Sequence, residues 1–99
     1  MDTLRKLEIL KDTYFDKVQL NQIVDKLLDI ALSQHRQKLE KYEHDMNEFE
    51  QRYGIESAIF YQRFQAGQLG DDIDFFEWSA LYELKEDLLK KIDKLEQAA

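Results

Sequence analysis

Twelve consecutive residues, GQLGDDIDFFEW from Gly67 to Trp78, combine carboxylates, glycines and aromatic side chains, so their chemistry is the first question. Clustered carboxylates suggest calcium, and an EF-hand loop needs a glycine at its sixth position and a bidentate Glu at its twelfth. Counted from Asp72, the sixth residue is Glu77, so the spacing fails. The stretch therefore does not predict a calcium loop.

The two histidines are the next candidates for metal binding. His35 and His44 are nine residues apart and cannot share a helix face as the ligands of an HExxH motif do. Glu40, His44 and Glu48 follow a four-residue spacing, which could hold a divalent ion only if a partner helix added ligands. We interpret His44 as a surface residue and predict no metal or cofactor.

The chain contains few groups suited to catalysis. It has no cysteine, and Ser33, Ser57 and Ser79 have no nearby base with a recognisable spacing. Asp71 and Asp72 are adjacent carboxylates, but no pocket-forming scaffold surrounds them in the sequence. We therefore predict that the protein is not an enzyme.

Composition and charge indicate which kind of molecule the protein binds and where in the cell it lies. The net charge is −7 and no basic stripe is present, which argues against direct nucleic-acid binding and favours a basic protein as partner. The N-terminus lacks a basic region followed by an apolar run, so we expect no signal peptide. Charges interrupt the longest apolar stretches, so we expect no membrane span and a cytoplasmic protein.

The distribution of helix breakers predicts the fold class. The chain has no proline, and its three glycines (Gly54, Gly67 and Gly70) fall in one short window. The long segments on either side are free of breakers, so the sequence predicts an all-α protein. Residues 16–99 form one helical hairpin domain in this prediction.

The first long helix is predicted from Asp16, which forms a capping box with Gln19, to Gly54 at its C-terminus. Its length is about 36 residues, or roughly 54 Å. Apolar residues recur in steps of four and three, the spacing of a coiled-coil seam. This seam consists of Leu28, Leu32, His35, Leu39, Tyr42, Met46, Phe49 and Tyr53. His35 is its polar member, of the kind that fixes register or oligomeric state.

The second long helix is predicted from about Phe75 to Glu96, with Asp74 and Glu77 as its capping box. Trp78 begins its buried stripe, one turn into the helix. Two long helices joined by about twenty residues run antiparallel and form a hairpin.

A short helix is predicted between them, with Ser57 as its cap and Gly67 as its end. Most aromatic residues fall between Tyr42 and Tyr82, which predicts an aromatic tip. Residues 1–15 are ambiguous, because Leu4, Leu7 and Leu10 favour a helix whereas Tyr14 and its neighbours favour extended chain.

The opening stretch then has two interpretations. In the structural one, Gly67 ends a helix, Gly70 permits a turn, and Asp74 and Glu77 cap the next helix, with Trp78 anchoring the tip. These roles leave Asp71, Asp72 and one of the two phenylalanines unexplained.

The second interpretation adds partner binding. Asp71 and Asp72 add charge beyond the predicted cap, and Phe75 and Phe76 lie about 100° apart on a helix, so only one faces the core. An exposed aromatic residue beside carboxylates is typical of a contact with a basic partner. Both interpretations remain open at this point.

The seam also predicts self-association. The first helix exceeds the second in length and would leave roughly 20 Å of apolar stripe uncovered. Exposed apolar surface of that size normally marks an interface. We predict a homodimer or larger helical bundle through the long helices.

The segments ALSQHRQKLEKYEHDMNEFEQRYG and FYQRFQAGQLGDDIDFFEWSALYEL resemble a family of small prokaryotic antitoxin-like proteins. The shared pattern is K-Y-E…F-E-x-R-Y-G followed by F-x-x-G-x-L-G-D-x-x-D-F-F-E-W, and it spans roughly Ala31 to Leu84. The resemblance implies a protein that binds and neutralises a ribonuclease-type toxin. The alternative is an oligomeric helical adaptor without an inhibitory role.

Overall fold

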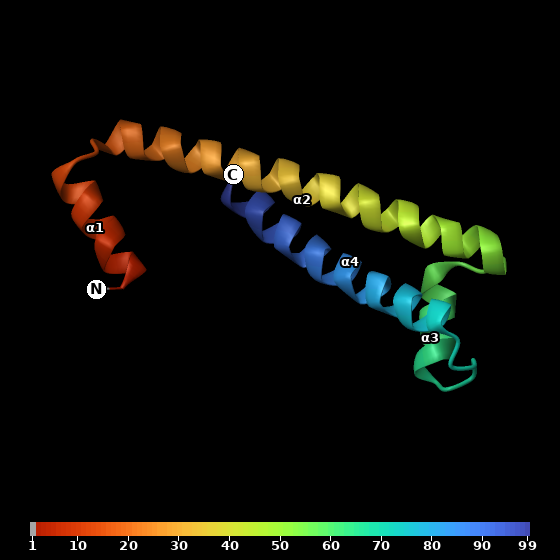
Figure 1. Cartoon of the computed structure of the whole chain (residues 1–99). Coiled ribbons are helices and arrows are strands. Elements are labelled where there is room, and N and C mark those ends of the chain that lie inside the picture. The colour runs from red at the N-terminus through yellow and green to blue at the C-terminus, as the bar shows by residue number, and fades with distance from the viewer. Residues whose placement is uncertain (1) are drawn as a thin grey trace.

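A computed structural model describes residues 2–99 as four helices and, within that range, no strand. They are α1 (Thr3–Thr13), α2 (Lys17–Tyr53), α3 (Ser57–Gln65) and α4 (Ile73–Ala98). Helices α2 and α4 run antiparallel, α3 closes one end, and α1 turns away at the other (Figure 1). The molecule is elongated, with extents of 59 × 26 × 19 Å. The predicted all-α hairpin with a short connecting helix is confirmed.

The ends of the first helices follow the predicted capping chemistry. Asp16 accepts a hydrogen bond from the backbone N–H of Gln19, and the Gln19 side chain accepts one in return from the backbone N–H of Asp16. Gly54 ends α2 with φ of 71°, and Gly67 follows α3 with φ of 70°. Only glycine adopts this left-handed conformation without strain. Gly70 lies in the α3–α4 connection without a positive φ.

Residues 3–13 resolve the ambiguity at the N-terminus in favour of a helix. The side chain of Asp2 caps α1 by accepting from the backbone N–H of Arg5 at 2.7 Å. The helix ends just before Tyr14, whose ring meets that of Phe15 edge-to-face at 5.0 Å. The N-cap from Asp2 stabilises the start of α1, and the leucine spacing favours a helix, so residues 3–13 are helical.

The start of α4 differs from the prediction. The helix begins at Ile73 and is capped by Asp72, whose carboxylate accepts from the backbone N–H of Asp74 at 2.9 Å. The predicted start at Phe75 and the capping box of Asp74 with Glu77 are therefore wrong. An aspartate at either position is a suitable N-cap. The Asp74 side chain instead accepts hydrogen bonds from Arg52 and Tyr53 of α2, which leaves Asp72 as the cap.

Two buried clusters hold the hairpin together. At the tip, the buried side chains are those of Met46, Phe49, Phe60 and Trp78. Along the stem, the cluster comprises Leu32, Leu88 and Ile92, with Leu39, Tyr42 and Leu95 packed against it. Both clusters combine residues of α2 and α4, as expected for antiparallel helices with heptad spacing, and α3 adds Phe60 to the tip.

The predicted oligomer seam is therefore used within one chain. Leu32 and Met46 are buried by α4 and the tip, and Leu39 and Tyr42 pack against the stem cluster. Leu28 and His35 are half-buried. Leu32, Leu39, Tyr42 and Met46 thus pack within the hairpin. The predicted self-association through this seam stays a prediction.

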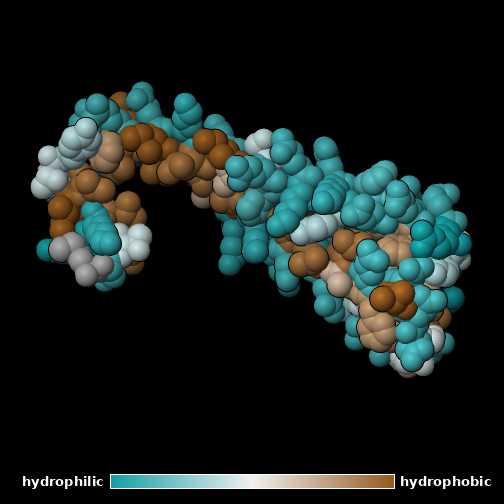
Figure 2. All heavy atoms as spheres, in the orientation of Figure 1, coloured by the Kyte–Doolittle hydropathy of each residue, from teal (hydrophilic) through white to brown (hydrophobic). Residues whose placement is uncertain are grey.

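Apolar side chains without a covering helix lie further towards the N-terminus. We call α1 together with residues 17–30 of α2 the arm. Exposed apolar side chains, brown in Figure 2, line the inner side of the bend between α1 and α2. They include Leu4, Leu7, Leu10, Ile23, Val24, Leu27 and Ile30. Within residues 2–99, none of the helices combines the length and the apolar character that crossing a membrane requires.

Candidate functional site

Trp78 is the centre of the tip and organises everything around it. Its side chain is fully buried, and its ring stacks on Phe60 with centroids 3.8 Å apart and planes within 6°. Phe49 of α2 lies against it at 5.6 Å. Side chains from α2 and α3 thus stack on a residue of α4, which the predicted buried stripe placed in the core. The prediction that Trp78 anchors the tip is confirmed in its burial.

Ser57 has a different role from the predicted one. Glu56 is the N-cap residue of α3 and makes no side-chain cap bond. The Ser57 hydroxyl instead accepts from the Trp78 indole N–H at 2.9 Å, and its backbone N–H donates to Glu50 at 2.8 Å. A buried indole N–H needs an acceptor, and the Ser57 side chain supplies it. Ser57 therefore joins the start of α3 to both long helices.

The predicted contact residues at the tip divide into exposed and engaged groups. Asp71 and Phe76 are exposed, Phe76 by 55%, while Phe75 is half-buried against Tyr53. One of the two phenylalanines thus faces the core, as their angular separation predicted. Ile73 is 79% exposed beside them, and the sequence reasoning missed it. We call Asp71, Ile73 and Phe76 the tip surface.

Asp72 does not belong with the surplus carboxylates. Its side chain caps α4, and its backbone carbonyl accepts from Phe75 and Phe76. The sequence interpretation treated both aspartates as unnecessary for the helix cap, and for Asp72 this is wrong. The physical reason is the start of α4 two residues before the predicted one.

Asp74 forms a small polar network that ties α4 to the end of α2. Its carboxylate accepts from the Tyr53 hydroxyl at 2.6 Å and from Arg52 at 2.8 Å. The hydrogen bond from Tyr53 and the neighbouring Arg52 guanidinium lower the pKa of the Asp74 carboxyl below its ordinary value. The same carboxylate raises the pKa of the Tyr53 hydroxyl. Asp74 is thus a structural residue, while Glu77 lies exposed further along α4.

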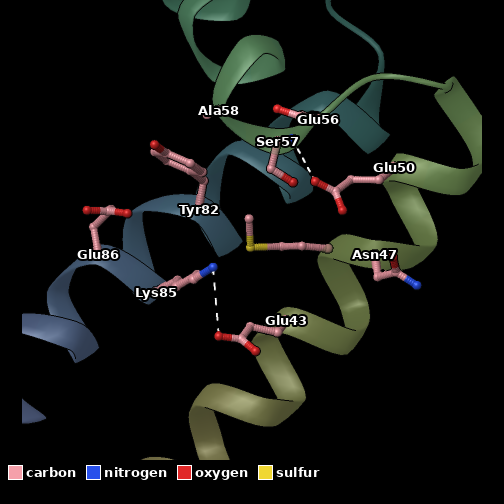
Figure 3. Close-up of a pocket in the computed structure, with 10 residues that line it drawn as sticks. Glu43, Asn47, Glu50, Glu56, Ser57, Ala58, Tyr82, Lys85 and Glu86 are labelled. Carbon is pink, nitrogen blue, oxygen red and sulfur yellow. Dashed lines mark hydrogen bonds and ion pairs between the residues drawn. The ribbon is translucent and has the colours of Figure 1, made fainter.

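An open groove of about 800 Å³ lies between α2, α3 and α4 near the tip (Figure 3). We call it the acidic groove. Four of its lining side chains are glutamates, one is a lysine, and the rest are neutral. Its lining consists of Glu43, Met46, Asn47, Glu50, Glu56, Ser57, Ala58, Tyr82, Lys85 and Glu86. The volume falls within the range of ordinary binding pockets.

Two of the four glutamates of the acidic groove already have a partner within the chain. Glu43 lies 3.8 Å from Lys85, and Glu50 accepts from the Ser57 backbone N–H, as the dashed lines in Figure 3 mark. Within residues 2–99, the side chains of Glu56 and Glu86 form no ion pair or hydrogen bond. These two carboxylates line the groove and remain accessible to a partner's cation.

The sequence could not indicate this groove. Its carboxylates come from α2, the start of α3 and the middle of α4, so no local spacing joins them. Only the packing of α3 across the hairpin brings Glu56 towards Glu86. The helical spacing of Glu43, Met46 and Glu50 was the one available signal, because it places them along one side of α2.

The groove offers charge and shape to a binding partner. Across residues 2–99, no three His, Asp or Glu side chains come close enough to share a metal ion. No model of a protein family matches the chain, and no match is found among curated proteins or solved structures.

Proposed function

We propose that the protein is an antitoxin-like binding protein, which neutralises a basic, ribonuclease-type toxin by occupying its active-site cleft. The acidic groove is the observation that carries the proposal. It presents four glutamates and one lysine in a hollow large enough for several side chains. A cleft that binds RNA carries Lys and Arg, and those side chains pair well with carboxylates.

The charge of the groove supports a basic partner. Glu56 and Glu86 form no ion pair among residues 2–99, so an incoming guanidinium would gain a charge-assisted hydrogen bond. A carboxylate in a toxin cleft would also repel the phosphate of the RNA substrate. Complementary charge accelerates association and excludes partners of like charge.

The tip surface supplies the apolar part of the proposed contact. Ile73 and Phe76 are exposed by 79% and 55%, and Asp71 lies beside them. Large exposed side chains of this kind become anchors when a partner buries them. The Phe76 ring is held edge-on by Phe64 at 5.3 Å, so less side-chain freedom is lost on binding.

The test begins with the product of the neighbouring gene. If it is a small basic protein, it should arrest growth when expressed alone, and co-expression of this chain should restore growth. The purified pair should form a complex whose affinity falls as the salt concentration rises. Binding no tighter than that of an unrelated basic protein of similar charge would contradict the proposal.

A matched pair of variants tests the acidic groove. We expect Glu56→Gln with Glu86→Gln to weaken binding at least about ten-fold, since close charge pairs at interfaces contribute 1.5 kcal/mol or more by rough measure. The control is Asp25→Asn with Asp29→Asn on the arm, which removes the same charge from exposed positions. Equal loss in both variants would mean that net charge alone, and not the groove, attracts the partner.

A further inference from the structure

We propose that the arm is a self-association surface and that the arm of a second copy of this chain covers it. The first observation is exposure. Leu4, Leu7 and Leu27 are exposed by 74%, 54% and 59%, although each belongs to the apolar stripe of its helix. In the stem the corresponding residue Leu32 is only 6% exposed, because α4 covers it.

The stripes of α1 and α2 open onto the same hollow. Leu4 and Leu7 face Leu20 and Val24 across a space of about 300 Å³. Figure 2 shows the apolar side chains gathered along the inner side of this bend. The two helices therefore present a concave apolar surface rather than two separate faces.

The exposed apolar surface of the arm is extensive. Seven residues of the two stripes are between 41% and 74% exposed: Leu4, Leu7, Leu10, Ile23, Val24, Leu27 and Ile30. A standard complex takes roughly 800 Å² from each partner. A typical monomer exposes no apolar patch larger than about 600 Å². The arm therefore offers an apolar surface for a second copy to bury.

Charge favours a second copy over the basic partner of the tip. Residues 2–30 carry five Lys or Arg and six Asp or Glu, a net charge of −1, whereas residues 31–99 carry nine and fifteen, a net charge of −6. Two arms can therefore meet without strong repulsion. Their acidic hairpins would point away from one another and leave both tips free.

The arm is also self-complementary in length. Residues 17–30 of α2 extend roughly 21 Å beyond α4, and the eleven residues of α1 span roughly 16 Å. Each chain thus offers an apolar helix and a bare apolar face of similar length. A two-fold axis would place the helix of each copy on the face of the other, which is the geometry of an isologous dimer.

The measurement is the mass of the purified full chain by light scattering at tens of micromolar. We expect twice the chain mass of 11.9 kDa. A mass of 11.9 kDa would overturn the proposal. This outcome does not depend on the proposed inhibition of a toxin, because no partner is present in the experiment.

Two variants locate the interface. Leu27 and Val18 are nine residues apart, so they lie on opposite sides of α2, and their exposures of 59% and 66% are similar. We expect Leu27→Glu to be monomeric and Val18→Glu to remain dimeric, with the helical circular dichroism of the hairpin retained in both. A dimeric Leu27→Glu would place the interface elsewhere and overturn the proposal.

A cross-linking measurement keeps the proposal testable if Leu27→Glu loses its fold. The chain has no cysteine, so one introduced cysteine is the only thiol. We expect Ile23→Cys, on the apolar stripe, to form a covalent dimer under mild oxidation at much higher yield than Val18→Cys. Equal yields would mean random collision, or that the arm binds another occupant such as a lipid surface, and would overturn the assignment to a second copy.

Discussion

The tip and the arm of this protein are both rich in apolar side chains, yet only the tip buries them. At the tip three helices meet, so Trp78 stacks against both Phe49 and Phe60 and is fully buried. In the arm, α1 and α2 diverge and no other helix among residues 2–99 covers them, so Leu27 remains 59% exposed. The comparison teaches that an amphipathic stripe specifies a helix, whereas burial depends on another helix packing against the stripe, as α4 does on Leu32 in the stem.

The largest expected effect is a loss of stability when the buried side chain at the centre of the tip is removed. Trp78→Ala should destabilise the fold by about 3–5 kcal/mol, because it removes a large buried aromatic side chain and leaves a cavity. Denaturant unfolding followed by circular dichroism gives the free energy. Val18→Ala, an exposed arm position, should change it by no more than about 0.5 kcal/mol. Similar losses in both variants would mean that the tip holds no special share of the stability.

The helix caps sharpen the comparison with a smaller effect. Asp72→Ala should cost about 1 kcal/mol of unfolding free energy, and Asp72→Asn much less, because Asn also accepts at an N-cap. Asp2 caps α1 in the same way at 2.7 Å. At dilution, Asp2→Ala should lower the helix content without changing the main unfolding transition. An equal shift of that transition by Asp2→Ala would show that the arm unfolds together with the tip.

The smallest expected effect is the pH dependence of the Asp74 network. The pKa of the Asp74 carboxyl is lowered in the folded state by Tyr53 and Arg52, so its stabilising effect is complete above the unfolded pKa, near 4. It is lost as the pH falls through the lower folded pKa. The stability difference between wild type and Asp74→Asn should therefore be constant above about pH 5 and shrink below about pH 4. A constant difference down to pH 2, by rough measure, would contradict the role of the network.

Much of the fold followed from sequence spacing, because helix periodicity and capping residues are local. The heptad steps from Leu28 to Tyr53 predicted the hairpin, and the phase of the second helix predicted the burial of Trp78. Asp16 with Gln19, and Gly54, fixed the ends of α2.

The start of α4 and the candidate site depended on contacts between helices, which the sequence does not contain. Asp72 and Asp74 are equally good caps, and the choice between them rests on Arg52 and Tyr53, some twenty residues away. The sequence predicts Ser57 as a helix cap, whereas in the structure its hydroxyl accepts a hydrogen bond from the Trp78 indole. The acidic groove joins three helices, so its carboxylates could be recognised only together.

The most direct test of the contrast between a self-sufficient tip and an arm that needs a second copy is backbone hydrogen exchange measured at two protein concentrations. We predict that amides of the tip, from Met46 to Phe64 and around Trp78, are protected equally at both concentrations. Amides of residues 3–30 should be protected at tens of micromolar and exchange rapidly at high dilution, because their burial depends on the partner copy. Protection of the arm that does not change with concentration would contradict the account.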